Sequence, residues 1–528
     1  MNSISPKNLK PMLTAEAEIA FLDVREHGQY GEGHPFFSVN VGYSTIEVEA
    51  PLLVPRKDVT VVVMDDGDGV SERAVHALQK LGYTNVMVLE GGAQGWAAAG
   101  YTLFKGVNVP SKTFGELVEH ECMTPALSAD ELQLRLERDE PTVVLDGRPE
   151  HEYFKMSIPS ARSCPNAELA YRIPALAIDP ETTLVINCAG RTRSIIGAET
   201  LRQCGFANPI LALRNGTQGW ALSGFDLDHS VHSDPLPLVD SEARAQAART
   251  AKNLIKRLAL PQISAELLET WEKDPERTTY IFDVRTEEEF SAGHWPGARH
   301  APGGQLVQAT DQYLAVRNAR IILCDNTGLR AATTAMWLRG MGHDVSILDE
   351  DISQAVSSKI KCTDNIMVVD APLVSPEGAF GRVASGALLI DASRSQDYRN
   401  GHASGSIWIT RSQVKNLDCR SNDAIIVTGQ EKSLILGVVR EFLELGFTDL
   451  RWFQGSRQIW SLAGFEVEQT SDYPTDQECI DFLFFVHDRH DGNMDAARRY
   501  LEWETGLLAQ LDVQERGILQ PPQSNSIL

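Results

Sequence analysis

The chain has 528 residues, a formal net charge of −24 and a pI near 5.0. This length exceeds what one hydrophobic core supports and predicts three or four domains, and 43% hydrophobic residues suffice to fill their cores. The negative charge excludes nucleic acid and anionic membrane surfaces as partners, because either would be repelled at long range. Local positive charge must therefore attract any anionic substrate.

The compartment is predicted to be the cytoplasm. The opening MNSISPKNLKPML has no apolar core region or cleavage site of a secretory signal, and no apolar run reaches transmembrane length. Eight cysteines without a CxxC pair fit a reducing compartment better than disulfides or a zinc site.

The same succession of elements is predicted four times along the chain. Each copy has a helix start, an apolar strand ending in Asp, a second apolar strand, a helix ending near glycine, and a third strand. The helix starts are Ser5-Pro6, Ser128-Ala129, Ser264-Ala265 and Ser375-Pro376, and the aspartates are Asp23, Asp146, Asp283 and Asp391. Strands alternating with helices predict an α/β fold of four tandem modules, each a mainly parallel sheet flanked by helices.

The predicted boundaries follow these repeats. The four modules are expected at 1–107, 123–230, 261–360 and 370–470. A helical linker is expected at 231–260, between two pairs of repeats, with an extra helix packed on repeat 2 as the alternative. A helical tail at 471–528 completes the chain and has no assigned role.

One loop of repeat 2, CAGRTRS from residue 188, follows the strand LVIN and opens a helix. Ligands of parallel α/β sheets bind at this edge, where free amides and the helix macrodipole favour anions. Arg191 and Arg193 add positive charge, and Gly190 permits a tight turn. These features predict an anion cradle with the thiol of Cys188 as nucleophile, the alternative being a small buried hydrophobe.

The repeated order of these motifs resembles the rhodanese (sulfurtransferase) family. The shared pattern is strand-Asp-x-Arg, then Gly-His and Pro-Gly-Ala, then strand-Cys-loop-helix, then Gly-x-x-x-Trp-x-x-x-Gly. The resemblance reaches to about residue 470 and implies four rhodanese-like modules plus the helical tail. It implies no cofactor and no metal.

The resemblance also implies a reaction. Cys188 would take the outer sulfur of a small anionic donor such as thiosulfate and pass it to cyanide or a thiol. The donor would be bound by the residues of the loop, which are Ala189, Gly190, Arg191, Thr192 and Arg193. Around them, Asp146 and Arg148 are predicted to brace the loop as a charge-assisted pair, with Ser194 beside it; a surface ion pair is the alternative.

The corresponding loops of repeats 1 and 4 are predicted to be inactive. Repeat 1 has Asp65 at the cysteine position, with Asp66 and Asp68 after it, and these carboxylates would repel an anionic donor. A divalent-metal site at the three aspartates is the alternative. The loop of repeat 4 reads VTGQEKS and has no cysteine.

Repeat 3 offers a second candidate site. Cys324 and Arg330 are spaced as C-x5-R, which resembles cysteine-dependent phosphatases and arsenate reductases, but Asp325 adjoins the thiol. Cys164, near the expected mouth of repeat 2, is a candidate relay thiol.

The function predicted from these observations is a sulfurtransferase that works through a persulfide at Cys188, with repeats 1 and 2 packed as a pair. The alternatives are a non-catalytic scaffold or sulfur-relay binding protein, and phosphatase- or arsenate-reductase-like chemistry at Cys324. A sulfur-relay protein is a further candidate partner.

Overall fold

The computed structural model describes residues 2–235, 238–350, 352, 369–490 and 493–523. Cys362, most of the end of repeat 3 and the last residues of the tail lie outside these ranges. The chain forms two compact units: Met1–Pro11, Ile19–Val107 and Cys362–Phe484 make unit 1, and Met12–Glu18, Asn108–Lys361 and Phe485–Leu528 make unit 2. The predicted pairing of repeats 1 and 2 is therefore wrong: unit 1 holds repeats 1 and 4, and unit 2 holds repeats 2 and 3.

Repeat 2 is a parallel sheet in the order β6-β10-β9-β7-β8 with helices around it. Its strands are β6 (Ala126–Leu127), β7 (Thr142–Asp146), β8 (Arg162–Ser163), β9 (Thr183–Asn187) and β10 (Ile210–Leu213). Its helices are α7 (Ala129–Glu137), α8 (Glu150–Lys155), α9 (Asn166–Arg172), α10 (Thr192–Gln203) and α11 (Gly216–Leu222). All five residues of β9 are buried, as expected of a central strand covered on both faces.

Repeat 3 has the same topology, in the order β11-β16-β15-β12-β13. Its strands are β11 (Gln262–Ile263), β12 (Thr279–Asp283), β13 (Arg299–His300), β15 (Arg320–Cys324) and β16 (Asp344–Leu348). Its helices are α13 (Ala265–Glu272), α14 (Glu287–Ala292), α15 (Gly303–Gln308) and α16 (Leu329–Gly340).

Unit 1 contains the sheets of repeats 1 and 4. In repeat 1, β1 (Ser3–Ile4), β5 (Val86–Leu89), β4 (Thr60–Met64) and β2 (Ile19–Asp23) follow in that order, and β3 (Val39–Asn40) pairs with β2. Repeat 4 has the order β19 (Ile407–Trp408), β17 (Leu388–Asp391), β20 (Ile425–Thr428) and β21 (Leu450–Trp452). The main helices after the central strands are α4 (Val70–Lys80) and α19 (Lys432–Glu444). The four-module α/β architecture predicted from the repeats is confirmed.

The predicted helix ends are also confirmed. The side chains of Ser128, Ser264 and Ser375 each accept a backbone N–H in the first turn of the following helix. Four glycines with positive φ stand just beyond the helices that follow the central strands: Gly82, Gly205, Gly342 and Gly446.

Unit 2 also contains three long helices that lie outside the repeats. They are α6 (Val109–Cys122), α12 (Ser241–Leu258) and α22 (Met494–Gly506). Ala247 and Ala251 of α12 belong to the core of repeat 2, together with Leu329 of repeat 3. The predicted linker is therefore a helix that packs on repeat 2 and also reaches repeat 3. Within the described part of the chain, no helix is both long and apolar enough to cross a membrane.

Candidate active site

Cys188 stands between the central strand β9 and helix α10, as predicted. It is 2% exposed, and Ser194 Oγ lies 3.1 Å from its Sγ, where the hydroxyl donates a hydrogen bond. Among the described residues, no side chain accepts a hydrogen bond from the backbone amides of residues 189–193. These amides, at the positive end of the α10 macrodipole, are therefore available to stabilise a negative sulfur.

The two arginines of the loop are already paired with carboxylates. Arg191 donates to Glu116 at 2.6 and 2.9 Å and also contacts Glu119, both on α6. Arg193 forms a bidentate pair with Glu152 of α8, at 2.7 and 2.8 Å. Because both guanidinium groups are engaged, their placement fits bracing of the loop better than the donor binding predicted from the sequence.

The net pKa shifts of the two partner carboxylates are opposite, although each arginine lowers the pKa of its partner. Burial raises the pKa of Glu116 to about 7, even though Arg191 beside it acts in the opposite sense. Burial also raises the pKa of Glu152, but Arg193 outweighs that effect and brings the pKa down to about 2.

The predicted brace of Asp146 and Arg148 is a buried pair. Arg148 Nε and Nη2 donate to the Asp146 carboxylate at 2.8 and 2.7 Å, and Arg148 also donates to the Met156 carbonyl. Asn187, the last residue of β9, donates to the same carboxylate at 2.8 Å. The surface-pair alternative is wrong, because both partners are at most 1% exposed.

The register of the strands shows which residues of the other repeats correspond to Cys188. Asp146 is paired with Asn187, Asp283 with Cys324, Asp23 with Met64, and Asp391 with Thr428. The next residues along the chain are the equivalents: Cys188, Asp325, Asp65 and Gly429. Each stands seventeen residues before the glycine that follows its helix, so the loops of all four repeats have the same length.

In repeats 1 and 3 a carboxylate at this position takes the amides of its own loop. Asp65 accepts from the backbone N–H of Gly67 and Ser71, both at 2.9 Å. Asp325 accepts from the backbone N–H of Asn326 at 2.8 Å and of Arg330 at 3.0 Å. In these two loops, the carboxylate of the loop itself thus takes the place of an external anion.

The metal alternative for repeat 1 finds no support in this geometry. Asp65 is used by the loop amides, Asp66 pairs with Arg25 at 3.0 Å, and Asp68 accepts from the backbone of Val70. Over the described ranges, no group of three or more histidine, cysteine or acidic side chains is arranged to hold a metal ion.

Cys324 and Arg330 do not form a phosphatase-like site. Cys324 is the last residue of β15 and fully buried, and burial raises the pKa of its thiol well above the ordinary value. The guanidinium of Arg330 is bonded to Asp325, Glu289 and Glu168. No part of it is exposed, so it cannot bind a substrate anion.

Cys164 is equally unsuited to relay sulfur. It is fully buried, and burial raises the pKa of its thiol. A relay thiol must be accessible and ionisable.

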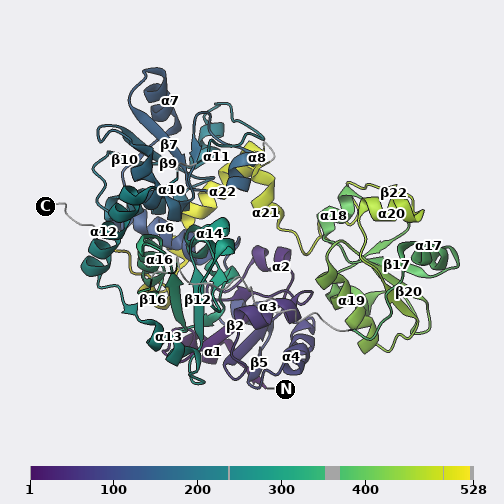
Figure 1. The fold of residues 1–528 in the computed structure, drawn as a ribbon. Coiled ribbons are helices and arrows are strands. Elements are labelled where there is room, and N and C mark those ends of the chain that lie inside the picture. Colours follow the sequence, from purple (N-terminus) through teal and green to yellow (C-terminus); the bar gives the residue numbers. More distant parts are fainter. Residues whose placement is uncertain (1, 236–237, 351, 353–368, 491–492, 524–528) are drawn as a thin grey trace. The chain divides into compact units, whose positions relative to one another are not determined.

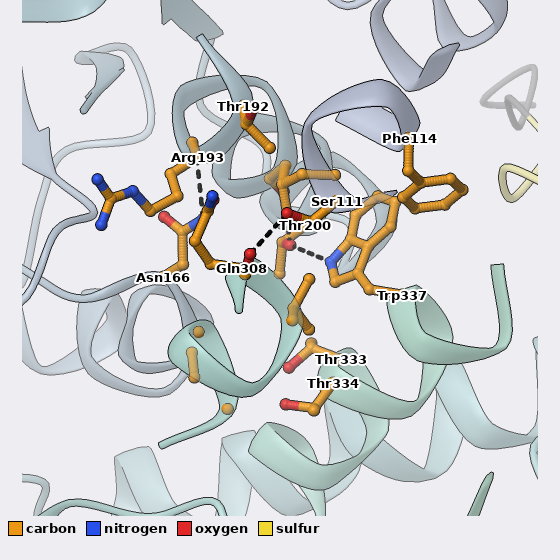
Figure 2. Close-up of a pocket in the computed structure, with 15 residues that line it drawn as sticks. Ser111, Phe114, Asn166, Thr192, Arg193, Thr200, Gln308, Thr333, Thr334 and Trp337 are labelled. Carbon is orange, nitrogen blue, oxygen red and sulfur yellow. Dashed lines mark hydrogen bonds between the residues drawn. The ribbon is translucent and has the colours of Figure 1, made fainter. Parts of the chain in front are cut away.

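A small cavity of about 20 Å³ lies behind the loop, between repeats 2 and 3. Figure 2 shows the bonds at its wall: Trp337 Nε1 donates to Thr200 at 2.8 Å, and Asn166 donates to the Arg193 carbonyl at 2.9 Å. The cavity has room for about one water molecule and none for a substrate.

Four acidic residues around the loop were missed in the sequence: Glu116, Glu119, Glu152 and Glu504. Three of them lie on α6 and α22, which belong to no repeat. The acidic i, i+3 pair of Glu116 and Glu119 was visible as a pattern, but no pattern indicates which loop such a pair faces.

Comparisons with known proteins match this architecture. The family model of the rhodanese-like domain matches three times, at residues 5–99, 128–223 and 264–357, which together make up more than half of the chain. The chain belongs to the rhodanese family. The fourth module keeps the parallel sheet outside the matched ranges.

A solved structure has the same overall organisation. Thiosulfate sulfurtransferase from Pseudomonas aeruginosa is 37% identical, with 98% of this chain and 99% of that chain covered and a TM-score of 0.88. The uncharacterized protein YibN of Escherichia coli (strain K12) is 30% identical over 95 residues, which are 18% of this rhodanese and 66% of the length of YibN.

Proposed function

We propose that this rhodanese is a thiosulfate sulfurtransferase in which Cys188 alone carries the sulfur. The observation that carries the proposal is the comparison of equivalent loops. In repeats 1 and 3 the loop amides bind the carboxylate of Asp65 or Asp325, whereas repeat 2 has a thiol at that position. A cradle that binds a carboxylate in two copies favours an anionic thiolate or persulfide in the third.

The reaction has two steps. The Cys188 thiolate attacks the outer sulfur of thiosulfate, so that a new S–S bond forms and sulfite leaves with the electron pair of the old one. The terminal sulfur of the persulfide is then attacked by cyanide or a thiolate, and the thiolate of Cys188 is regenerated. The amides of residues 189–193 and the hydroxyl of Ser194 stabilise the negative sulfur in both resting forms.

The other charged residues hold this cradle in shape. Arg191 and Arg193 join the loop to α6 and α8, and the Asp146–Arg148 pair supports the strand end beneath it. The 2% exposure of Cys188 favours a small donor over sulfur delivered by a relay protein, because a protein-bound persulfide needs a more open thiol.

The test is the intact mass of the protein after brief incubation with thiosulfate and desalting. The wild type should gain one sulfur, Cys188→Ser should gain none, and Cys324→Ser should gain as much as the wild type. No gain in the wild type would favour the scaffold function instead. A gain lost in Cys324→Ser would move the site to repeat 3.

A further inference from the structure

The C-terminal helix α22 packs beside the outer side of the Cys188 loop. It contacts α6 and α11, and Figure 1 shows it in yellow next to these helices and α10. Its buried face includes Tyr500, Leu501 and Glu504, while Glu502 points to solvent. A segment that follows all four repeats therefore lies against the candidate active site.

Glu504 is the polar contact of this helix with the loop. Its Oε1 accepts a hydrogen bond from Thr192 Oγ1 at 2.8 Å, and the residue is 2% exposed. Among the described residues, its Oε2 has no hydrogen-bond partner. A Cβ added at Gly190 would lie 3.0 Å from this Oε2, so the carboxylate is packed against the loop backbone.

Burying a carboxylate with one oxygen unbonded is costly, so a positional role is needed to explain it. Thr192 is the first residue of α10, and its backbone N–H is one of the loop amides to which the proposed function assigns stabilisation of the sulfur. Holding its side chain fixes the first turn of the helix. A small change in that turn would redirect the amides.

The equivalent loops of repeats 1 and 3 support this role of Glu504, because they are held in a different way. The residues equivalent to Thr192 are Leu329 in repeat 3 and Gly69 in repeat 1, neither of which has a hydroxyl. Those loops are held by hydrogen bonds from their own backbone N–H groups to the side chains of Asp325 and Asp65. The loop with the thiol has no internal carboxylate, and it is the one held from outside through a hydroxyl.

We propose that Glu504 is a positioning residue for the Cys188 loop: by accepting the hydrogen bond of Thr192, it fixes the first turn of α10 and the amides that stabilise the sulfur anion. The inference rests on the proposed function, since it assumes that Cys188 is the sulfur carrier. It assigns the C-terminal tail a part in the reaction at repeat 2.

The experiment measures the pH dependence of alkylation of Cys188 by iodoacetamide in the full chain, read by peptide mass. Glu504→Gln keeps an acceptor for Thr192, whereas Glu504→Ala removes it. Because the loosened loop stabilises the thiolate less, the alkylation midpoint of Glu504→Ala should lie about one pH unit above that of Glu504→Gln, a tenfold smaller thiolate fraction. Glu502→Gln, on the exposed side of the same helix, is the matched control.

Equal midpoints in Glu504→Ala and Glu504→Gln would overturn the proposal, and so would an equal shift in Glu502→Gln. If circular dichroism shows that Glu504→Ala is unfolded, Thr192→Val and Thr192→Ser make the same comparison from the other partner, with Val expected at the higher midpoint. Sulfur uptake is measured separately: a wild type that takes up no sulfur contradicts the proposed function but leaves the alkylation comparison valid.

Discussion

The loops of Cys188 and Asp325 are two versions of one structure. Each follows the central strand of its sheet, has the same length, and pairs an arginine five residues on with a glutamate of the preceding short helix: Arg193 with Glu152, and Arg330 with Glu289. They differ in the residue at the centre, a thiol in one and a carboxylate in the other. The arginine-glutamate pair persists without a cysteine, so it belongs to the architecture of the loop rather than to sulfur chemistry.

The comparison also explains why repeat 3 is inactive in the proposed function. Asp325 accepts hydrogen bonds from the amides of its own loop and neutralises the fully buried Arg330, so the charges of this loop balance one another. An equivalent carboxylate in repeat 2 would occupy the place of the sulfur. The residue that follows the central strand thus determines whether the loop is a candidate active site or only a structural element.

The largest effect is expected from Cys188→Asp, which converts the loop of repeat 2 into the type seen in repeat 1. Sulfur uptake from thiosulfate should fall to background, because the nucleophile is lost and the amides are occupied. The variant should nevertheless fold, since Asp65 is accommodated at the same place. Intact mass and circular dichroism test both parts, and an unfolded variant would contradict the equivalence of the two loops.

Asp325→Ala should be strongly destabilising. The variant removes one of the carboxylates that pair with the buried Arg330, and it leaves the loop amides without their acceptor. Breaking a buried ion pair costs about 3–5 kcal/mol. Urea unfolding measures the change in the free energy of unfolding. The exposed Asp349→Ala is the control and should change it by less than about 0.5 kcal/mol. Similar values for the two variants would refute the structural role of Asp325.

The pH dependence of stability should distinguish the Cys188 loop from the loop of repeat 3. Repeat 2 has Arg191 paired with Glu116, whereas repeat 3 has Gly328 at the position of Arg191. The pKa of Glu116 is raised by burial to about 7 from an ordinary 4.5, so the folded state favours the protonated form. The contribution of Glu116 to stability should therefore fall as pH rises from about 4.5 to 7. Relative to the wild type, Glu116→Gln should gain in melting temperature across this window, and a constant difference would contradict the prediction.

The smallest effect is expected from Cys324→Ala. The side chain packs in the apolar core of repeat 3, so the variant should lose about 1 kcal/mol of unfolding free energy through the small cavity left behind. Sulfur uptake should equal that of the wild type. Reduced uptake at unchanged stability would restore Cys324 as a candidate.

Most of the predictions that the structure confirms rest on local sequence patterns. Apolar runs ending in aspartate, serine caps and glycine helix ends are short-range signals, and together they predicted four α/β modules and the position of Cys188. The buried pair of Asp146 and Arg148 was also within reach, because its partners are two residues apart in the chain.

The misassigned features all depend on distant contacts. The equivalence of Asp325 with Cys188 follows from the pairing of β12 with β15, whereas the sequence drew attention to Cys324, one residue earlier. Repeat 2 packs with repeat 3 rather than repeat 1, and Glu116 and Glu504 reach the loop from helices outside the repeats. The repeats thus specify the cradle and its nucleophile locally, whereas its charge balance depends on side chains from distant parts of the chain, which burial and packing bring together on folding.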